Sequence, residues 1–242
     1  MDVEKLPEVS KPTIFLIPTV LAGDTAFEVL PASVIAAINE LDVFFVENVR
    51  TARRFISSLK LGKVIDKITF FELSKDTPPE QTRRQLKALS KNAGILSEAG
   101  VPCVADPGST AVAMAHELGY RIKPLTGPSS ILLALMGSGF SGQTFTFHGY
   151  LPIDRTERAK MLSQMEMRLS KYGQTQIFME TPYRNNQLLQ TIIEVCQPST
   201  KLCIAADITG RDELIQTRTL AGWKKAMPDL HKKPTIFLMG GA

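Results

Sequence analysis

The sequence has few residues that could bind a metal or form disulfide bonds. Its 242 residues include three cysteines (Cys103, Cys196 and Cys203), with no CxxC pair, and three histidines. An odd number of thiols without metal-ligand spacing excludes a disulfide framework and a zinc site built on CxxC pairs. With so few histidines we expect no metal site and thiols that stay reduced.

Long apolar runs and targeting segments are also missing. The longest candidate, residues 131–136 with their flanks, is interrupted by Gly137 and Gly139, so it is too short to cross a bilayer. The first eight residues are acidic and polar and lack the apolar centre of a signal peptide. We therefore expect a cytoplasmic protein with no membrane contact.

Several common catalytic and nucleotide-binding motifs are absent as well. The chain has no GxGxxG fingerprint, no GxxxxGK[ST] loop, no GxSxG elbow and no HExxH pair. These absences exclude the usual dinucleotide-binding dehydrogenases, P-loop NTPases, serine hydrolases and zincin proteases. The net charge of +4 permits a polyanionic partner but does not require one.

What is present is an alternation of short β-branched runs with amphipathic segments of helical length. This alternation predicts parallel βαβ units and an α/β fold. The expected strands are 13–18, 43–47, 68–73, 93–96, 120–124, 145–149, 176–180, 202–208 and 235–239. The expected helices are 32–41, 79–92, 109–118, 129–136, 155–172, 183–195 and 220–227.

The chain is broken near its middle by Lys123-Pro-Leu-Thr-Gly-Pro128, after which a helix of small residues begins. We therefore expect two domains. The first, residues 1–124, is an α/β domain with a parallel sheet. The second, residues 125–242, is an α/β domain with a mixed sheet.

Four loops combine glycine, proline and small hydroxyl residues directly after expected strands. They are residues 17–24, 96–110, 125–130 and 179–184. In open α/β sheets ligands bind beyond the carboxyl ends of the strands, and glycine lets the main chain approach a ligand closely. Any one of these loops could be ordinary turn chemistry; four together after strands weaken that interpretation but leave it open beside a binding site.

One of these loops carries a resemblance to a known family. Ser97-Glu-Ala-Gly-Val-Pro-Cys-Val-Ala-Asp-Pro-Gly108 resembles the S-D-A-G-x-P-x-x-x-D-P-G segment of the ribosomal RNA small subunit methyltransferase I family, a branch of the tetrapyrrole methylases. The other similar segments follow in the family's order: 16–19, 47–50, 125–131, 147–152, 180–184 and 234–235. The resemblance covers about residues 13–240.

The resemblance implies two α/β lobes of the tetrapyrrole-methylase type with the ligand cleft between them, a homodimer, and S-adenosyl-L-methionine as cofactor. It also implies that main-chain groups make most of the cofactor contacts. The residues expected to bind the cofactor are Pro18, Ser97, Glu98, Ala99, Gly100, Val101, Asp106, Gly127, Pro128, Ser129, Ser130, Glu180, Thr181, Tyr183, Ala206 and Pro234.

The chain departs from the family's pattern at several places. The acidic E-D-T-R segment is Glu47-Asn-Val-Arg50, so one carboxylate is lost, and the S-D-A-G aspartate is Glu98. The R-E-L-T-K-x-H-E segment is residues 206–213, Ala-Asp-Ile-Thr-Gly-Arg-Asp-Glu, without the lysine and histidine. These losses affect the expected substrate side more than the cofactor side.

Glu47 and Arg50 are the candidate catalytic residues, because they follow an expected strand and could orient the acceptor or take its proton. The alternative is an ordinary strand-end salt bridge. Arg53 and Arg54 share a helical face with Arg50, and such a stripe suits contacts with RNA phosphates, although a solvated basic face is the alternative. Arg184 is the third candidate for substrate binding.

Three further candidates have structural alternatives. Asp106 could fix its loop by capping the helix at Ser109. Glu98 could be an exposed loop carboxylate. Tyr183 could flank an adenine or be a buried tyrosine at a helix start.

The function that these residues predict is transfer of a methyl group from S-adenosylmethionine, an in-line displacement that depends on alignment of the acceptor. The expected acceptor is a ribose 2′-hydroxyl of small-subunit ribosomal RNA. One alternative is C-methylation of a tetrapyrrole such as a corrin precursor. The other is a cofactor-binding protein that has lost catalysis.

Overall fold

The computed structural model describes residues 11–106 and 108–241. The chain divides into two compact units. Unit 1 contains residues 11–20, 26–106 and 108–128, and unit 2 contains residues 21–25 and 129–241. The expected boundary lay at residue 124; in the structure unit 1 continues to Pro128, and the short segment Leu21–Thr25 packs with unit 2.

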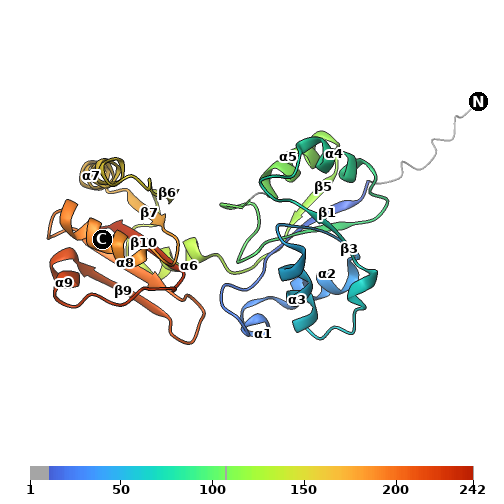
Figure 1. The fold of residues 1–242 in the computed structure, drawn as a ribbon, viewed down its shortest axis with the longest axis horizontal. Coiled ribbons are helices and arrows are strands. Elements are labelled where there is room, and N and C mark those ends of the chain that lie inside the picture. Colours follow the sequence, from blue (N-terminus) through green and yellow to red (C-terminus); the bar gives the residue numbers. More distant parts are fainter. Residues whose placement is uncertain (1–10, 107, 242) are drawn as a thin grey trace, which may run out of the picture. The chain divides into compact units, whose positions relative to one another are not determined.

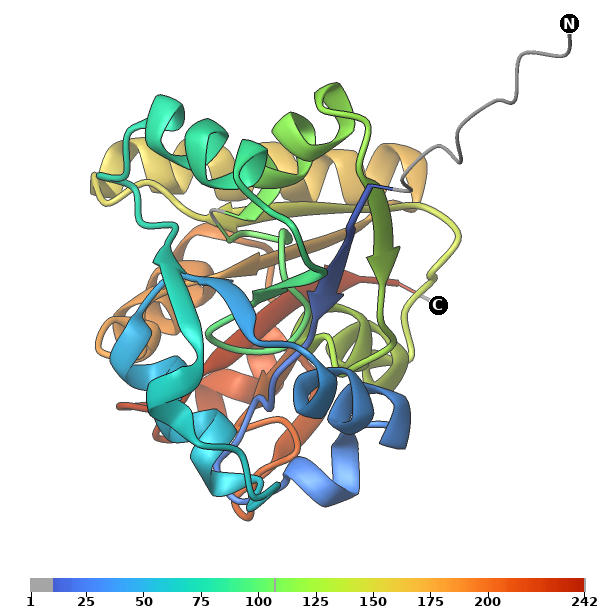
Figure 2. The ribbon, with the colours of Figure 1, turned by 90° about the vertical axis from the view of Figure 1, so that its right-hand side faces the viewer.

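Unit 1 is built on a five-stranded sheet in the order β3-β2-β4-β1-β5, in which every pairing is parallel. Figure 2 shows β1 and β5 running side by side in the same direction. Its elements are β1 (Thr13–Ile17), α1 (Ala26–Val29), α2 (Ala32–Glu40), β2 (Val43–Val46), α3 (Val49–Ser58), the 3₁₀ turn η1 (Ile65–Lys67), β3 (Thr69–Glu72), α4 (Pro79–Lys87), β4 (Ala93–Leu96), α5 (Gly108–Glu117) and β5 (Arg121–Pro124).

Both faces of this sheet are covered by helices, as Figure 1 shows for unit 1. On one face Ile38 of α2 and Ile56 of α3 pack with Phe44 of β2. On the other face Leu86 of α4 and Met114 of α5 pack in one cluster with Phe45, Ala93 and Ile95 of the strands. Strands buried on both faces read as continuous apolar runs, which explains why Phe44 and Phe45 are adjacent and both fully buried.

Unit 2 is built on a five-stranded mixed sheet in the order β6-β7-β10-β8-β9. β6 and β7 are parallel, whereas β10 is antiparallel to β7 and β8, and β9 is antiparallel to β8. Its elements are α6 (Ser130–Ser138), β6 (Phe145–Tyr150), α7 (Arg155–Tyr172), β7 (Thr175–Met179), α8 (Asn185–Val195), β8 (Lys201–Ala206), β9 (Leu214–Thr219), α9 (Leu220–Lys225) and β10 (Thr235–Gly240).

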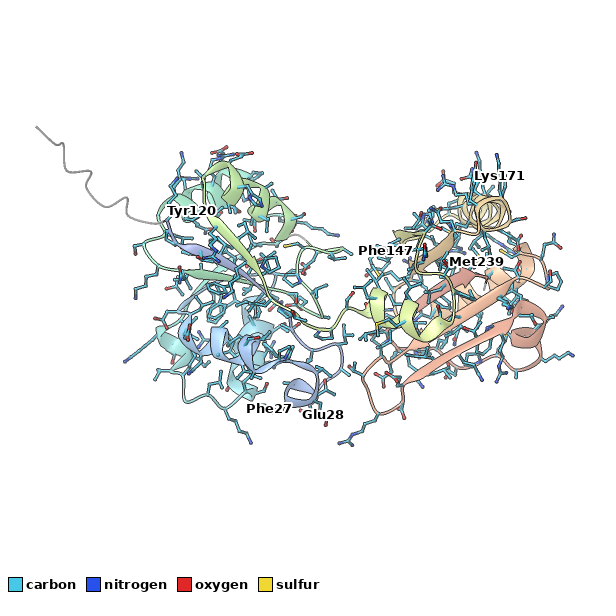
Figure 3. All side chains as sticks on the ribbon, turned by 180° about the vertical axis from the view of Figure 1, so that it is seen from behind. Phe27, Glu28, Tyr120, Phe147, Lys171 and Met239 are labelled. Atoms are coloured by element: carbon cyan, nitrogen blue, oxygen red, sulfur yellow. The ribbon has the colours of Figure 1, made fainter. Side chains whose placement is uncertain are left out.

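The core of unit 2 also has two parts. Helices α7, α8 and α9 pack on one face, where Trp223 is almost fully buried and its indole nitrogen donates to the carbonyl of Leu202 at 2.8 Å. Helix α6 covers the other face with Ala134 and Leu135. Met239 of β10, labelled in Figure 3, is completely buried in the first of these clusters.

The predicted α/β class and the two α/β units are confirmed. Four elements were not predicted: α1, α3, η1 and β9. Helix α3 lies in a stretch rich in arginine, and β9 reads Leu-Ile-Gln-Thr-Arg-Thr, with only two aliphatic residues. β9 exists because the whole strand pairs with β8, a long-range contact that local composition does not reveal. Within the described residues, no helix has the length and apolar character that crossing a bilayer requires.

Candidate functional site

The loops that follow β1 and β4 in unit 1 are joined by hydrogen bonds. The main-chain N–H of Thr19 donates to the carbonyl of Gly100 at 2.9 Å, and the hydroxyls of Thr19 and Ser97 lie 3.2 Å apart. The Ser97 hydroxyl also donates to the carbonyl of Gly100. Thr19 and Ser97 are buried, so the two loops form one rigid structure at the carboxyl edge of the parallel sheet.

The loop after β4 contains several residues with left-handed backbone conformation. Gly100 has φ of 71°, and the non-glycine residues Cys103 and Ala105 have φ of 68° and 61°. Such conformations cost non-glycine residues about 1–3 kcal/mol each and gather at ligand-binding sites. Within this loop Glu98 and Ala99 are exposed and Val101 is half-buried. Glu98 and Ala99 are therefore at the surface of a strained, well-braced loop.

The loop after β5 packs directly on the loop after β1. A Cβ atom added to Gly127 would lie 2.2 Å from Cγ and 2.3 Å from Cβ of Pro18. Only glycine permits this approach. Pro128 and Ser129 are buried and Ser130 is half-buried. The Ser129 hydroxyl accepts from the N–H of Leu132 at 3.4 Å and so caps α6.

Three carboxylates of unit 1 interact near the same sheet edge. Glu47 follows β2, Glu98 follows β4 and Asp106 precedes α5. Burial, then the charge of Glu47 and a hydrogen bond with it, and then the charge of Glu98 raise the pKa of Asp106 from 3.8 to about 6. Burial and the charge of Glu47 raise the pKa of Glu98. A carboxyl group that titrates near neutrality beside other acids is typical of a proton-transfer site.

The proposed cap of α5 by Asp106 is absent. Among the hydrogen bonds of the described residues, none joins the Asp106 side chain to the N–H of Ser109. The structural alternative for Glu47 was a strand-end salt bridge with Arg50. No such ion pair occurs in the described part of the chain. Asp106 and Glu47 are therefore left to interact with each other rather than with the structural partners that the sequence offered.

Helix α3 carries the three arginines of the predicted basic stripe. Asn48 caps this helix by accepting from the N–H groups of Arg50 at 2.9 Å and Thr51 at 3.1 Å. Arg50 and Arg54 are exposed, and within the described residues neither forms an ion pair. Arg53 instead pairs with Asp66. The basic stripe without an acidic partner therefore consists of Arg50 and Arg54, and not of all three arginines.

In unit 2 the loop after β7 is held by a buried carboxylate. Glu180 Oε1 accepts from the N–H of Thr181 at 2.7 Å and from Arg184 Nη2 at 2.6 Å, and the Glu180 side chain is fully buried. Glu180 Oε2 and Arg184 Nε are buried without a partner among the described residues. Burying such groups unpaired is costly, so they mark a place where a ligand could complete the hydrogen bonding.

The other predicted residues of unit 2 lie at the same edge of its sheet. β7 and β8 both run antiparallel to β10, so Glu180 and Ala206 lie at the end of the sheet where β10 begins after Pro234. The N–H of Asp207 donates to the carbonyl of Pro234 at 2.9 Å. Tyr183 is 71% exposed, so it is not the buried helix-start tyrosine of the alternative interpretation.

Three residues of these edges were not singled out from the sequence. Thr19 joins two loops and Asn48 caps α3; the available signals were the hydroxyl of Thr19 after a strand and the amide of Asn48 before a helix. Thr209 has φ of 68° and a buried hydroxyl without a partner among the described residues. Its signal was the adjacent glycine, Gly210. No group of three or more His, Cys, Asp or Glu side chains suited to a metal occurs within the described residues.

The sequence and the fold are similar to those of known methyltransferases. The family described as Tetrapyrrole (Corrin/Porphyrin) Methylases matches residues 22–222. The "Ribosomal RNA small subunit methyltransferase I" of Vibrio cholerae is 28% identical over 216 residues, which are 87% of this chain and 69% of that protein.

Two solved structures share the fold. The methyltransferase CobJ has a TM-score of 0.62 and 17% identity, with 96% of this chain and 95% of that chain covered. The uroporphyrin-III C-methyltransferase of Thermus thermophilus, complexed with S-adenyl homocysteine, has a TM-score of 0.53 and 14% identity, with 94% and 97% covered.

Proposed function

Since the chain belongs to the tetrapyrrole (corrin/porphyrin) methylase family, we propose that it methylates a ribose 2′-hydroxyl of small-subunit ribosomal RNA. It is an S-adenosylmethionine-dependent methyltransferase. The observation that carries the proposal is the carboxyl edge of the unit 1 sheet. There, hydrogen-bonded loops lie at the same edge as three interacting carboxylates.

The residues present fit an adenosyl cofactor. A sulfonium with a nucleoside needs shape and hydrogen-bond partners, and the strained loop around Gly100 brings Glu98 and Ala99 to the surface. In unit 2 the buried acceptor Glu180 Oε2 is without a partner among the described residues, and it could receive a donor such as a ribose hydroxyl. When bound, S-adenosylmethionine supplies an electrophilic methyl group.

We assign the cofactor contacts to the residues expected from the sequence, with the following roles. In unit 1 they are the main-chain groups of the Ser97–Val101 loop and the Pro18–Gly127 contact; for Glu180–Tyr183, Ala206 and Pro234 of unit 2, a cofactor contact stays the expectation from the sequence. Asp106 is the exception, because its interaction with Glu47 favours a role in proton transfer over cofactor binding.

The residues of unit 1 can remove the acceptor's proton. A carboxylate oxygen of Glu47 or Asp106 would accept the proton that the acceptor hydroxyl loses as it gains the methyl group and the C–S bond of the cofactor breaks. Burial and like charge raise the pKa of Asp106 to about 6, closer to neutral pH, where a base is most effective.

Exposed arginines supply the positive charge that an RNA acceptor needs. Arg50 and Arg54 lie one helical turn apart on α3, so both can contact phosphates and orient the ribose. Arg53 is already paired with Asp66, and Arg184 with Glu180, so each of these two arginines stabilises a loop of its own unit. A homodimer is expected from the family and stays a prediction.

Two measurements test the proposal. Calorimetry should show binding of S-adenosylhomocysteine by the purified chain. Transfer of a labelled methyl group should then occur to small-subunit ribosomal particles or their RNA, at a ribose that mapping identifies. Glu47→Gln should lower kcat by about 10²–10⁴-fold, the usual contribution of a general base, without weakening cofactor binding.

The outcomes separate the three hypotheses. Binding without transfer to any ribosomal RNA would favour a cofactor-binding protein that has lost catalysis. Transfer to a uroporphyrinogen and not to RNA would favour the tetrapyrrole alternative. No binding of the cofactor product would overturn the proposal as a whole.

A further inference from the structure

The structure assigns to unit 2 a surface for a single-stranded RNA segment, at which an unpaired base stacks on the ring of Tyr183 and lysines contact the phosphates. We call it the Tyr183 platform; it consists of Tyr183, His231, Lys232 and Lys233. This inference rests on the proposed function, because it names where the RNA substrate is held.

The platform is an exposed aromatic group on a rigid base. Tyr183 is 71% exposed, and its ring forms a T-shaped contact with the His231 ring, with centroids 5.9 Å apart and planes at 72°. A large ring left this exposed contributes little to the core of its unit. A T-shaped contact covers at most one face of Tyr183, so the other face stays available for stacking.

Hydrogen bonds tie together the two loops that carry these residues. The N–H of Lys232 donates to the carbonyl of Pro182 at 3.0 Å, and Asn185 Nδ2 donates to the carbonyl of Lys233 at 2.7 Å. Asn186 donates through Nδ2 to Asp229 at 2.8 Å and accepts through Oδ1 from the N–H of Leu230 at 2.8 Å. The ring and the lysines are therefore preorganised, which lowers the entropy lost on binding.

The conformation of Lys232 is a second sign of a functional surface. Its φ of 61° is left-handed, which lysine adopts only at a cost, and its side chain is exposed. Strained non-glycine residues that the surrounding structure fixes occur preferentially at binding sites. Here the strain places a lysine beside an exposed aromatic pair.

The charge of the segment suits a polyanion. Residues 224–233 contain Lys224, Lys225, Lys232 and Lys233 and a single acidic residue, Asp229. Asp229 is already engaged, since its Oδ1 accepts from Asn186 and from the N–H of His231 at 3.0 Å. None of the four lysines forms an ion pair within the described residues.

Aromatic rings that stack bases beside cations that hold phosphates are the usual means of binding single strands. A duplex hides its base faces, so a ring that stacks bases favours an unpaired segment. A porphyrin with carboxylates offers a related flat anion, and it is the competing ligand in the test.

The test measures fluorescence anisotropy of a labelled, unstructured single-stranded RNA with the full chain and no cofactor. Tyr183→Ala should weaken binding by at least about fivefold, the lower limit for the loss of one base stack. Tyr183→Phe keeps the ring and should bind like the wild type. The double variant Lys232→Ala/Lys233→Ala should reduce the slope of log K against log salt by about 1.4, for two phosphate contacts on a single strand.

The chain offers a matched control on the same unit. Tyr172 is 64% exposed and has the Lys171 ammonium 5.1 Å from its ring centre, at the end of α7 labelled by Lys171 in Figure 3. Tyr172→Ala with Lys171→Ala removes a comparable exposed aromatic and lysine and should leave RNA affinity unchanged. An equal loss in this control would overturn the inference, because binding would then be non-specific.

Further outcomes keep this inference separate from the proposed function. Unchanged RNA affinity in Tyr183→Ala refutes the platform, whatever the cofactor measurements show. If Tyr183→Ala loses affinity for S-adenosylhomocysteine and RNA alike, the ring serves the cofactor and the platform is wrong. The platform would also be refuted if the chain bound uroporphyrin and not RNA, and if Lys232→Ala/Lys233→Ala abolished that binding. Failure of wild-type methyl transfer, with RNA binding dependent on Tyr183, would refute only the proposed function.

Discussion

Replacing Gly127 by alanine tests how the loops of unit 1 are built. The added methyl would lie 2.2 Å and 2.3 Å from two ring carbons of Pro18, whereas carbon atoms in contact are normally about 3.5–4.0 Å apart. A proline ring is fixed to the backbone and cannot rotate away as the end of a long side chain can. The loop after β1 or the loop after β5 must therefore move.

The expected cost follows from this geometry. Overpacking of a well-packed site destabilises by about 1–3 kcal/mol. For a chain of this size each kcal/mol lowers Tm by about 2–4 °C, so we expect Tm to fall by about 2–12 °C. Because Pro18 belongs to the loop that Thr19 links to Gly100, its movement should also weaken binding of S-adenosylhomocysteine.

Calorimetry of unfolding and of ligand binding measures both effects. Gly142→Ala is the control, since its added methyl would meet only Leu135 Cδ2 at 3.8 Å, an ordinary contact. Pro18→Gly combined with Gly127→Ala removes the clashing ring and should restore part of the lost stability. A Gly127→Ala protein with wild-type Tm and wild-type affinity would refute the packing argument.

Three further perturbations follow from the contacts of the site. The pKa of Asp106 is raised from 3.8 to about 6, so the folded state favours the protonated form and loses stability as pH rises through this interval. Asp106→Asn should therefore raise Tm relative to wild type above pH 6 and not below pH 4. An equal difference in Tm at both pH values would refute the shift. Asn48→Ala removes the cap of α3 and should cost about 1 kcal/mol in denaturant unfolding, with no change expected if solvent replaces the cap fully. Arg184→Ala removes a charged hydrogen bond from the buried Glu180 and should lower the free energy of unfolding by about 2 kcal/mol, more than Arg184→Lys does. Equal stability of the two variants would show that the ion pair is dispensable.

Local sequence signals determined much of the fold. Short β-branched runs separated by helical periodicity predicted the α/β class, and glycine, proline and hydroxyl residues after the strands located the loops of the candidate site. These signals are local, because strand propensity and turn conformation depend on a few neighbouring residues. They failed for β9, whose polar composition is compatible with a strand only because β8 lies beside it.

The partners of individual side chains were decided by tertiary structure. The sequence alone could not show that Arg53 pairs with Asp66 or that Asp106 interacts with Glu47, since these partners are 13 and 59 residues apart along the chain. It showed that Gly127 and Pro18 belong to binding loops, but not that one packs against the other. Residue type and spacing determine local conformation, whereas distances between distant residues, and with them burial and pKa, arise only when the sheets assemble.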